Sequence, residues 1–253
     1  MKIVCIGSGN VATHIAQAFT IAGASIVQVW SKQIQHAALL ANTVDAAAIT
    51  DPGAIDQSAD LYIIAVKDDA ILEMVQALKS VKGLVVHTSG STPIEVLSPL
   101  SSYGVLYPLQ TFSKVKELDF KKIPLCIEAK DHDTLEALKN IASRLSPLVY
   151  IVNSDKRKIL HLAAVFACNF VNHLYTLSEQ ILKDNALDFD MLRPLIMETA
   201  EKVQAELPGH VQTGPAVRKD EQTIERHLGL LQAMPQTKEI YQTLSESIKK
   251  THQ

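Results

Sequence analysis

The 253-residue chain has few cysteines and a net charge close to zero. Its three cysteines, Cys5, Cys126 and Cys168, are odd in number and far apart in apolar sequence, which favours buried reduced thiols over disulfides or a metal site. A net charge of −3 gives no basic surface of the kind that binds nucleic acid. No secretory leader and no apolar run of membrane-spanning length is apparent. We therefore expect a cytoplasmic protein that binds no metal, membrane or nucleic acid.

The first twelve residues have the pattern of a buried strand, a turn and a helix. The apolar residues 3–6 precede the sequence Gly-Ser-Gly-Asn-Val-Ala at 7–12. In such a turn the first glycine permits a tight bend, the second lets a pyrophosphate approach the backbone, and the small third residue lets the helix pack on the strand. Free N–H groups at the helix start face the anion. The residues predicted to hold a dinucleotide here are Gly7, Ser8, Gly9, Asn10 and Val11.

Two halves of the chain differ in periodicity. Up to residue 152, strands are predicted at 25–30, 61–66, 84–87, 104–107, 125–128 and 148–152, between helices at 10–22, 33–41, 69–80, 93–101 and 131–145. This alternation predicts an α/β fold with a doubly wound parallel sheet. Beyond residue 153 helical patterns dominate, at 154–183, 189–206, 220–233 and 236–250. We therefore expect a dinucleotide-binding domain at 1–152 and an all-α domain at 153–253, whose modest core predicts a homodimer.

The end of the second strand bears on which cofactor is bound. Folds of this type that bind NAD usually have Asp or Glu here for the ribose 2′-hydroxyl. This chain has Ser31 and Lys32, a hydroxyl and a cation that suit a 2′-phosphate. The alternative is that Ser31 caps the helix starting near Gln33 and that Lys32 is merely solvated. The sequence favours NADP, and the fluorescence of Trp30, beside the adenosine site, is expected to respond to it.

Several motifs resemble a known group of enzymes. They are Ala65-Val66-Lys67-Asp68-Asp69-Ala70-Ile71, His87-Thr88-Ser89-Gly90-Ser91, the segment 158–175 and the segment 213–220 continuing to His227-Leu228. Together they resemble the β-hydroxyacid dehydrogenase and deazaflavin-dependent NADP oxidoreductase group, in a branch where an uncharacterised helical domain follows a Rossmann-like domain. The resemblance covers essentially the whole chain. It implies an NADP-binding reductase with a helical dimerisation domain and no settled substrate.

The loops after the central strands are expected to surround the nicotinamide, since ligands bind off the carboxyl ends of a doubly wound sheet. Val66, Lys67 and Asp68 therefore join the predicted cofactor site. The loop with His87, Thr88, Ser89 and Gly90 is rich in hydroxyls, and the resembled dehydrogenases hold substrate with such a loop. The alternative is that Ser91 or Thr92 caps a helix starting at Pro93 while His87 satisfies a strand end.

The long helix from residue 154 carries a second polar set. At about 100° per residue, His161, Cys168 and Asn172 fall nearly in line, and Asn169 and His173 share the same broad arc. The resembled dehydrogenases place a Lys and an Asn on this helix, with the Lys as proton donor. Here His161 occupies the place where that donor is sought, although Lys156 and Lys158 lie earlier in the helix. The alternative is that His161 and Asn169 are polar core residues that fix packing or a dimer interface.

These residues predict an NADPH-dependent reductase of a small carbonyl or imine compound, including 2-oxo acids. The proposed catalytic residues are His161, Asn169 and Ser89. The proposed substrate-binding residues are His87, Thr88, Gly90, His173 and Arg218, where Arg218 offers a guanidinium for a carboxylate or phosphate unless it only pairs with Asp220 or Glu221. The alternative functions are a cofactor sensor or scaffold that binds NADP without turning it over, and hydride exchange with deazaflavin.

Overall fold

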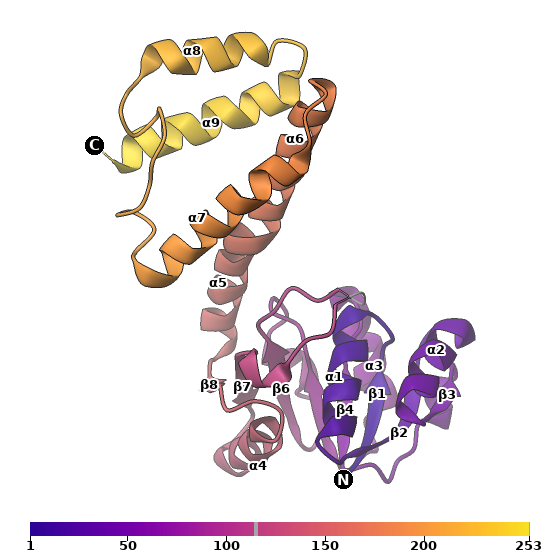
Figure 1. The fold of residues 1–253 in the computed structure, drawn as a ribbon. Helices are drawn as coiled ribbons and strands as arrows, with labels where there is room; N and C mark the ends of the chain where they lie inside the picture. Colours follow the sequence, from indigo (N-terminus) through magenta and orange to yellow (C-terminus); the bar gives the residue numbers. More distant parts are fainter. Residues whose placement is uncertain (114–115, 253) are drawn as a thin grey trace. The chain divides into compact units, whose positions relative to one another are not determined.

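The structure, a computed structural model, describes residues 1–113 and 116–252. The chain divides into two compact units, Met1–Asn169 and Phe170–Gln253 (Figure 1). The first unit holds the sheet and the second is helical. The strands end at Ile151 and the helices of the C-terminal half begin at Ser154, next to the predicted domain boundary, but the first of these helices belongs to the compact unit of the sheet.

The first unit is built on one eight-stranded sheet of order β3-β2-β1-β4-β5-β6-β7-β8. The strands are β1 (Lys2–Ile6), β2 (Ser25–Trp30), β3 (Ala47–Ile49), β4 (Leu61–Ile64), β5 (Leu84–His87), β6 (Tyr103–Pro108), β7 (Leu125–Ala129) and β8 (Val149–Ile151). The predicted doubly wound fold is confirmed. Two details differ: the three-residue β3 was not predicted, and β6 and β7 pair antiparallel, whereas every other pair is parallel. The chain changes direction across the sheet between β1 and β4, where such folds bind ligands.

Helices cover both faces of the sheet because its strands alternate their side chains. Ile3 and Cys5 of β1 pack into one buried cluster with α1 (Asn10–Ile21), α2 (Ile34–Val44) and α4 (His132–Ser143). Val4 and Ile6 pack into the other with α3 (Ile71–Ala77). Burial on both faces explains why the central strands have near-continuous apolar sequences.

The prediction of a helix at 93–101 is wrong. The structure has only the short 3₁₀ turn η3 (Ile94–Leu97), and Pro93 is extended, with φ −72° and ψ 153°. Pro99 explains the early end, because a proline lacks the N–H that a continuing helix needs and its ring clashes with the preceding turn. The other 3₁₀ turns are η1 (Pro52–Ala54), η2 (Asp68–Ala70), η4 (Phe120–Lys122) and, in the helical unit, η6 (Phe189–Leu192).

The C-terminal half is all-α among the described residues, as predicted. One long helix comprises α5 (Ser154–Ala164), a π-helical segment (Val165–Phe170) and α6 (Val171–Asp184); α7 (Arg193–Ala205), α8 (Glu221–Leu230) and α9 (Pro235–Thr251) follow. The second unit has a small core: among residues 170–252 the buried side chains are Ala216, Ile224, Leu231 and Ser245.

The long helix differs from its prediction in two respects. It spans 31 residues, Ser154–Asp184, with a window of mean hydropathy 1.2, so by length and composition it passes the test for a membrane span. The prediction that no apolar run reaches membrane-spanning length is therefore wrong, although a single helix of this kind is weak evidence for a membrane span. Its apolar window is unburied within the chain. Cys168, predicted to be buried, is exposed on this helix, whereas Cys5 and Cys126 are buried and all three thiols are free.

Candidate functional site

The glycine turn has the geometry that its sequence predicts. Gly7 has a φ of +124°, and a Cβ built on it would lie 2.1 Å from the carbonyl oxygen of Ala65. Its N–H donates to Trp30 O at 2.9 Å, so the turn is held between the ends of β2 and β4. Gly9 differs, because a Cβ built on it would have no atom within 4 Å. The first glycine is thus needed by the fold, and the second keeps backbone accessible to a ligand.

A pocket of about 720 Å³ opens at this turn, off the carboxyl ends of β1, β2, β4 and β5. All ten residues predicted for the cofactor line it, together with the predicted substrate loop residues Thr88 and Ser89. The cofactor set is Gly7, Ser8, Gly9, Asn10, Val11, Ser31, Lys32, Val66, Lys67 and Asp68. Trp30, Ala65, Asp69 and Ala70 complete the lining. The open face at Gly9 and the free helix start fit a pyrophosphate.

The end of β2 supplies a hydroxyl pair and a cation to this pocket. Ser8 Oγ donates to Ser31 Oγ at 3.0 Å, while α2 begins at Ile34 with no side-chain cap, so Ser31 does not act as the helix cap that was the alternative. Lys32 Nζ bonds Glu73 Oε2 at 3.1 Å, and both side chains are exposed to solvent. An exposed pair of this kind is weak enough for Lys32 to exchange its partner for a phosphate. Trp30 is buried, and its indole N–H donates to Thr50 O.

Hydroxyls of the β5 loop form the wall of the pocket nearest the sheet centre. Ser89 Oγ accepts from the backbone N–H of Ser91 and, at 2.9 Å, from that of Thr92. Ser91 Oγ donates to Asp68 and so ties this loop to the loop after β4. Ser91 and Thr92 therefore do not cap a helix at Pro93. They belong to a loop that is folded around the Ser89 hydroxyl.

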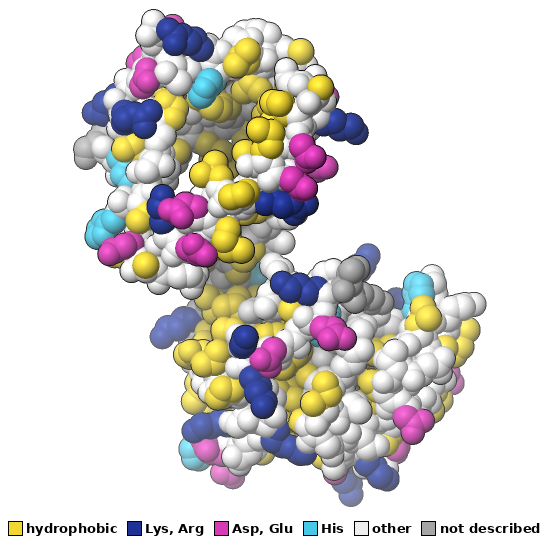
Figure 2. All heavy atoms as spheres, in the orientation of Figure 1, with side chains coloured by type: hydrophobic (Ala, Val, Ile, Leu, Met, Phe, Trp, Pro, Cys, Tyr) yellow, Lys and Arg dark blue, Asp and Glu magenta, His cyan; other side chains and the backbone are white. Residues whose placement is uncertain are grey.

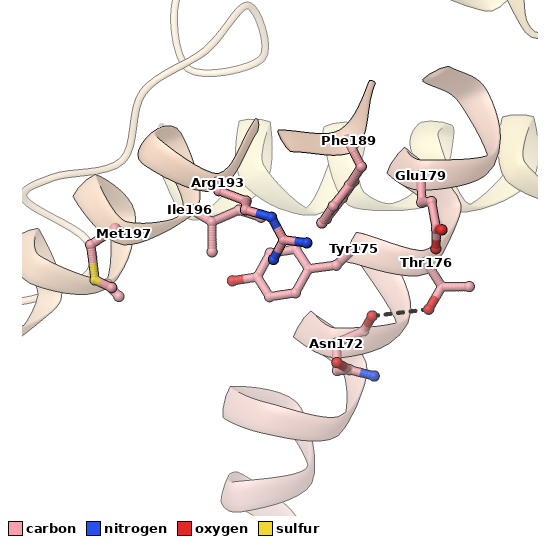
Figure 3. A pocket seen from close by; sticks show the side chains of 9 residues that line it. Asn172, Tyr175, Thr176, Glu179, Phe189, Arg193, Ile196 and Met197 are labelled. Carbon is pink, nitrogen blue, oxygen red and sulfur yellow. Dashed lines mark hydrogen bonds between the residues drawn. The ribbon is translucent and has the colours of Figure 1, made fainter. Parts of the chain in front are cut away.

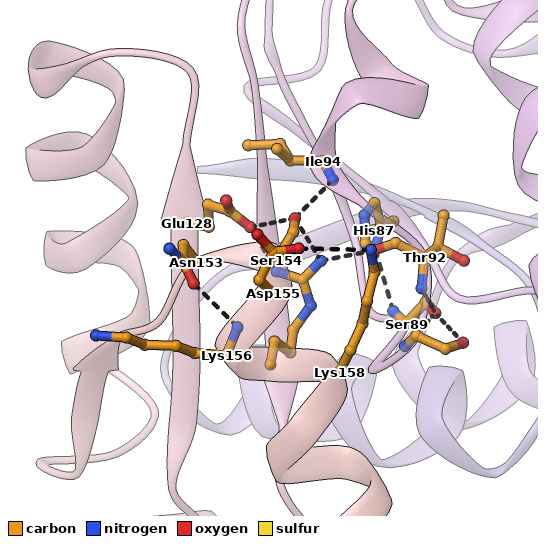
Figure 4. Close-up of polar contacts among 12 residues, drawn as sticks. His87, Ser89, Thr92, Ile94, Glu128, Asn153, Ser154, Asp155, Lys156 and Lys158 are labelled. Carbon is orange, nitrogen blue, oxygen red and sulfur yellow. Dashed lines mark hydrogen bonds and ion pairs between the residues drawn. The ribbon is translucent and has the colours of Figure 1, made fainter.

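His87 supports this loop from behind. It is fully buried, and its Nδ1 accepts from the N–H of Ser89 at 3.2 Å (Figure 4). Burial, followed by the nearby Arg157 charge, lowers the pKa of His87 to about 4. The imidazole is therefore neutral near pH 7 and fixes the loop backbone, and it does not line the pocket.

His161 lies against the same loop. A Cβ at Gly90 would lie 2.7 Å from Cγ and Nδ1 of His161, so the absence of a side chain at Gly90 lets the imidazole contact the loop backbone. Nδ1 of His161 is hydrogen-bonded to Tyr107 Oη at 3.0 Å, and the two rings meet edge to face. The structure thus brings together His161, Gly90 and Ser89 beside the pocket.

A buried ion pair holds α5, and with it His161, to the sheet (Figure 4). Arg157 has no exposed surface; its Nη1 bonds Glu128 Oε2 of β7 at 2.5 Å and its Nη2 donates to Thr92 O at 2.6 Å. Ser154 Oγ donates to the same carboxylate at 2.7 Å and accepts from the N–H of Ile94 at 2.9 Å. Since Arg157 and His161 are four residues apart on one helix face, they contact the same loop at Thr92 and at Gly90.

The remaining predicted residues are Asn169, His173 and Arg218. Asn169 is exposed at the end of the first unit, and His173 and Arg218 are exposed residues of the second. Their roles stay predictions. The helical alignment that grouped Asn169 and His173 with His161 assumed α-geometry throughout, but Val165–Phe170 is π-helical, with wider turns that shift the later side chains around the axis.

The second unit holds a pocket of its own, about 590 Å³, between α6 and α7 (Figure 3). Tyr175 and Phe189 give it aromatic walls, and Arg193 lies over the Phe189 ring at 5.5 Å while bonding Asp190. No group of three or more His, Cys, Asp or Glu within 1–113 and 116–252 is placed to hold a metal ion.

Sequence reasoning missed Tyr107, Arg157 and Glu128. Tyr107 was noted only as the end of a strand, yet it is the one side chain with a hydroxyl in the predicted strand 104–107. Arg157 was not singled out at all. A signal was present, because it precedes His161 by four residues and so shares its face.

Comparisons with known proteins agree with this architecture. Residues 1–112 match a Rossmann-like domain and residues 123–248 match a domain of unknown function, DUF2520. A "putative NADP oxidoreductase" of Bacteroides fragilis is 46% identical over 98% of both chains, with a TM-score of 0.94. A search of curated proteins found no match.

More distant solved structures share the fold. An imine reductase of Myxococcus stipitatus in complex with NADP⁺ is 13% identical over 99% of this chain and 92% of its own, with a TM-score of 0.64. A pyrroline-5-carboxylate reductase of Coxiella burnetii is 16% identical over 97% of both chains, with a TM-score of 0.59. The whole-length match at 46% identity decides the family. The chain belongs to the family in which a Rossmann-like domain is followed by the DUF2520 domain.

Proposed function

We propose that the protein is an NADP-dependent reductase that acts on a small carbonyl or imine compound. The observation that carries the proposal is the pocket at the glycine turn, whose wall includes Ser89, next to Gly90, against which His161 packs. A cofactor cradle alone would suit a binding protein. Hydroxyls and an imidazole beside it supply the groups that orient and protonate a reducible double bond. The Bacteroides fragilis relative named as an oxidoreductase and the reductases that share the fold support this reading.

The choice of NADP rests on the end of β2. Neither Ser31 nor Lys32 carries a carboxylate, which would repel a 2′-phosphate. The hydroxyls of Ser8 and Ser31 lie 3.0 Å apart and can donate hydrogen bonds to phosphate oxygens. Lys32 lies at the rim, and Lys67 adds a second cation to the lining. NADPH, when bound, supplies the hydride.

His161 is the proposed proton donor, and Ser89 the residue that orients the substrate oxygen or nitrogen. The imidazole is half-buried and held by Gly90 and Tyr107, and imidazole is the side chain that most often transfers a proton as a general acid or base. Lys156 and Lys158, the other candidates, are exposed on α5, and Lys158 lies 3.8 Å from Asp155.

The proposal predicts NADPH oxidation with a member of a panel of 2-oxo acids and cyclic imines, followed as loss of absorbance at the nicotinamide band. In His161→Ala the rate is expected to fall by roughly 10²- to 10⁴-fold, the usual range for loss of a general acid. Quenching of Trp30 fluorescence by NADPH should persist in this variant, because Trp30 lines the pocket from β2, and β1 and β4 separate β2 from the β5 loop that His161 contacts. His132→Ala, an exposed histidine on α4, is the matched control.

Each alternative has a distinct outcome in this experiment. Full activity in His161→Ala would contradict the assigned donor. Saturable quenching of Trp30 by NADPH with no turnover of any compound would favour a cofactor sensor or scaffold. NADH as effective as NADPH would contradict the role given to Ser31 and Lys32.

We also propose that the protein is a cytoplasmic homodimer joined through its helical unit. The second unit buries few side chains, while large apolar residues are exposed on its surface, visible as hydrophobic patches in Figure 2. They include Met191, Leu195, Met197 and Leu207, each at least 60% exposed. An apolar surface of this kind marks an interface. A second copy would cover it together with the apolar side of the Ser154–Asp184 helix, which accounts for that helix without a membrane.

The dimer is expected to appear in sedimentation velocity as a species of twice the monomer mass at micromolar concentration. Leu195→Glu together with Met197→Glu should shift it toward monomer, because burial of two carboxylates at an interface costs several kcal/mol. Ile21→Glu, an exposed apolar residue at the end of α1, is the control and should leave the dimer intact. A monomer at every concentration would contradict the proposal.

A further inference from the structure

The contact between Tyr107 and His161 joins two residues that are 54 positions apart in the chain. Tyr107, at the end of β6, is 8% exposed and lies opposite Cys126 in the antiparallel pair of β6 and β7. Its hydroxyl lies 3.0 Å from Nδ1 of His161, and the ring planes meet at 80°. The pair belongs entirely to the first unit.

The imidazole is held on two further sides. The backbone of Gly90 lies so close that a Cβ there would overlap Cγ and Nδ1 of the ring. One helical turn earlier, Arg157 bonds the carbonyl of Thr92 and fixes the helix to the same loop. The ring therefore has little freedom to turn away from Tyr107, and Nδ1 is occupied by its hydrogen bond with the Tyr107 hydroxyl. Proton exchange with a substrate has to use Nε2.

The direction of the hydrogen bond follows from burial. Burial is the main cause that raises the pKa of Tyr107 to about 12, so the phenol keeps its proton over the range in which enzymes are assayed. A buried hydroxyl proton needs an acceptor, and Nδ1 of His161 is the acceptor that the structure places within reach. A tyrosine that donates to Nδ1 selects the imidazole tautomer with its proton on Nε2.

We propose that Tyr107 is the positioning residue of His161, which keeps a proton on Nε2 and replaces that proton after it has been given to the substrate. This inference rests on the proposed reductase function. As the carbon of the C=O or C=N bond is reduced, the π electron pair of that bond moves to the oxygen or nitrogen, which takes the proton from Nε2. The N–H electron pair stays on the ring, and Nδ1 takes the hydroxyl proton of Tyr107, which leaves a phenolate. After product release Nε2 takes a proton from solvent and Nδ1 returns its proton to the phenolate, which restores the Nε2–H tautomer.

The titratable groups around Tyr107 and His161 keep a constant charge near neutral pH, so the pH dependence of activity should report on the relay itself. Burial raises the pKa of Cys126 on β7, so that thiol stays neutral, and His87 on β5, with its pKa lowered to about 4, is neutral as well. Arg157 on α5 is permanently cationic and paired with Glu128 on β7, and Lys158 on α5 lies near Asp155. Arg157 favours the phenolate that the relay forms, because its charge lowers the pKa of Tyr107 against the effect of burial.

The relay predicts how activity depends on pH. With Tyr107 as the proton source, a neutral imidazole can donate, so the single-turnover rate should be flat from about pH 6 to about pH 9. An imidazole without this proton source must be cationic to donate, and it loses that form as the pH rises. Tyr107→Phe is therefore expected to lie within about threefold of the wild type at pH 6 and to fall about tenfold per unit above pH 7. The phenylalanine keeps the ring contact, and Trp30 quenching by NADPH should be unchanged.

A second readout needs neither cofactor nor substrate. In protein labelled with ¹⁵N in the histidine rings, His161 of the wild type should show an unprotonated Nδ1 and a protonated Nε2 at pH 8. The Tyr107→Phe variant should show a mixture of tautomers. Tyr150→Phe, an exposed tyrosine on β8, is the matched control and should change neither readout.

The outcomes separate the relay from the reductase. A reductase whose pH profile and tautomer are unmoved by Tyr107→Phe would overturn the relay and leave the proposed function standing. A wild type that shows the Nε2–H tautomer but reduces no compound of the panel would overturn the reductase and with it the relay, while the tautomer control by Tyr107 would hold. A protonated Nδ1 in the wild type would overturn the inference directly.

Discussion

The Gly7→Ala variant is expected to lose roughly 3 to 5 kcal/mol of unfolding free energy and, with it, measurable NADPH binding, since a disfavoured φ and an overpacked contact each cost about 1 to 3 kcal/mol. The φ of +124° is one that residues with a side chain rarely adopt, and the added Cβ would lie 2.1 Å from Ala65 O. That carbonyl follows β4, where the N–H of Ala65 donates to Ile6 O at 2.7 Å, so the backbone cannot move aside cheaply. Urea unfolding and Trp30 quenching measure the two losses.

Gly9→Ala is the matched control for this prediction. Gly9 has a φ of −76°, and its Cβ would meet nothing within 4 Å, so the ligand-free protein should keep its stability within about 1 kcal/mol. NADPH binding should weaken at least tenfold, because the methyl group would occupy the space that a pyrophosphate needs. A Gly9→Ala variant with unchanged NADPH affinity would contradict the placement of the pyrophosphate. Equal stability of the wild type and Gly7→Ala would contradict the steric argument.

The sheet and its pocket could be predicted because their signals are local. A strand, a glycine turn and a helix occupy one short segment, so sequence spacing fixes which groups face the ligand. The loops after β4 and β5 follow from one topological rule, since carboxyl ends of neighbouring parallel strands share an edge of the sheet. All ten predicted cofactor residues therefore lie around a single pocket.

The parts that sequence reasoning missed depend on residues far apart or on departures from ideal geometry. Tyr107 meets His161 across 54 positions and Arg157 meets Glu128 across 29, and no periodicity joins such pairs. The polar arc from His161 to His173 assumed a uniform turn of 100°, which the π-helical segment breaks. The helix predicted at 93–101 followed from Pro93 as a helix start, and the prediction took no account of Pro99, which the sequence also shows.

The Arg157→Met variant is expected to lose roughly 3 to 5 kcal/mol of unfolding free energy, the usual cost of breaking a buried ion pair from one side. Arg157 is fully buried, and the side chain of Glu128 is 15% exposed, so solvent cannot replace the lost cation. The carboxylate would keep Ser154 Oγ as a donor but would carry an uncompensated charge. Urea unfolding measures the loss. Arg193→Met, which breaks an exposed pair with Asp190, is the matched control and should change the unfolding midpoint very little.

The double variant Arg157→Met, Glu128→Leu separates the charge of this pair from its role in holding the loop. Because both charges are gone and apolar groups of similar size replace them, most of the lost stability should return. The contact between Arg157 and Thr92 O does not return, so the loop that carries Ser89 and Gly90 loses its link to α5. The double variant should therefore be stable, bind NADPH as judged by Trp30 quenching, and still turn over at least tenfold more slowly than the wild type. Full recovery of turnover would show that the ion pair serves the fold alone, and failure to recover stability would show that the hydrogen bonds of Arg157 outweigh its charge.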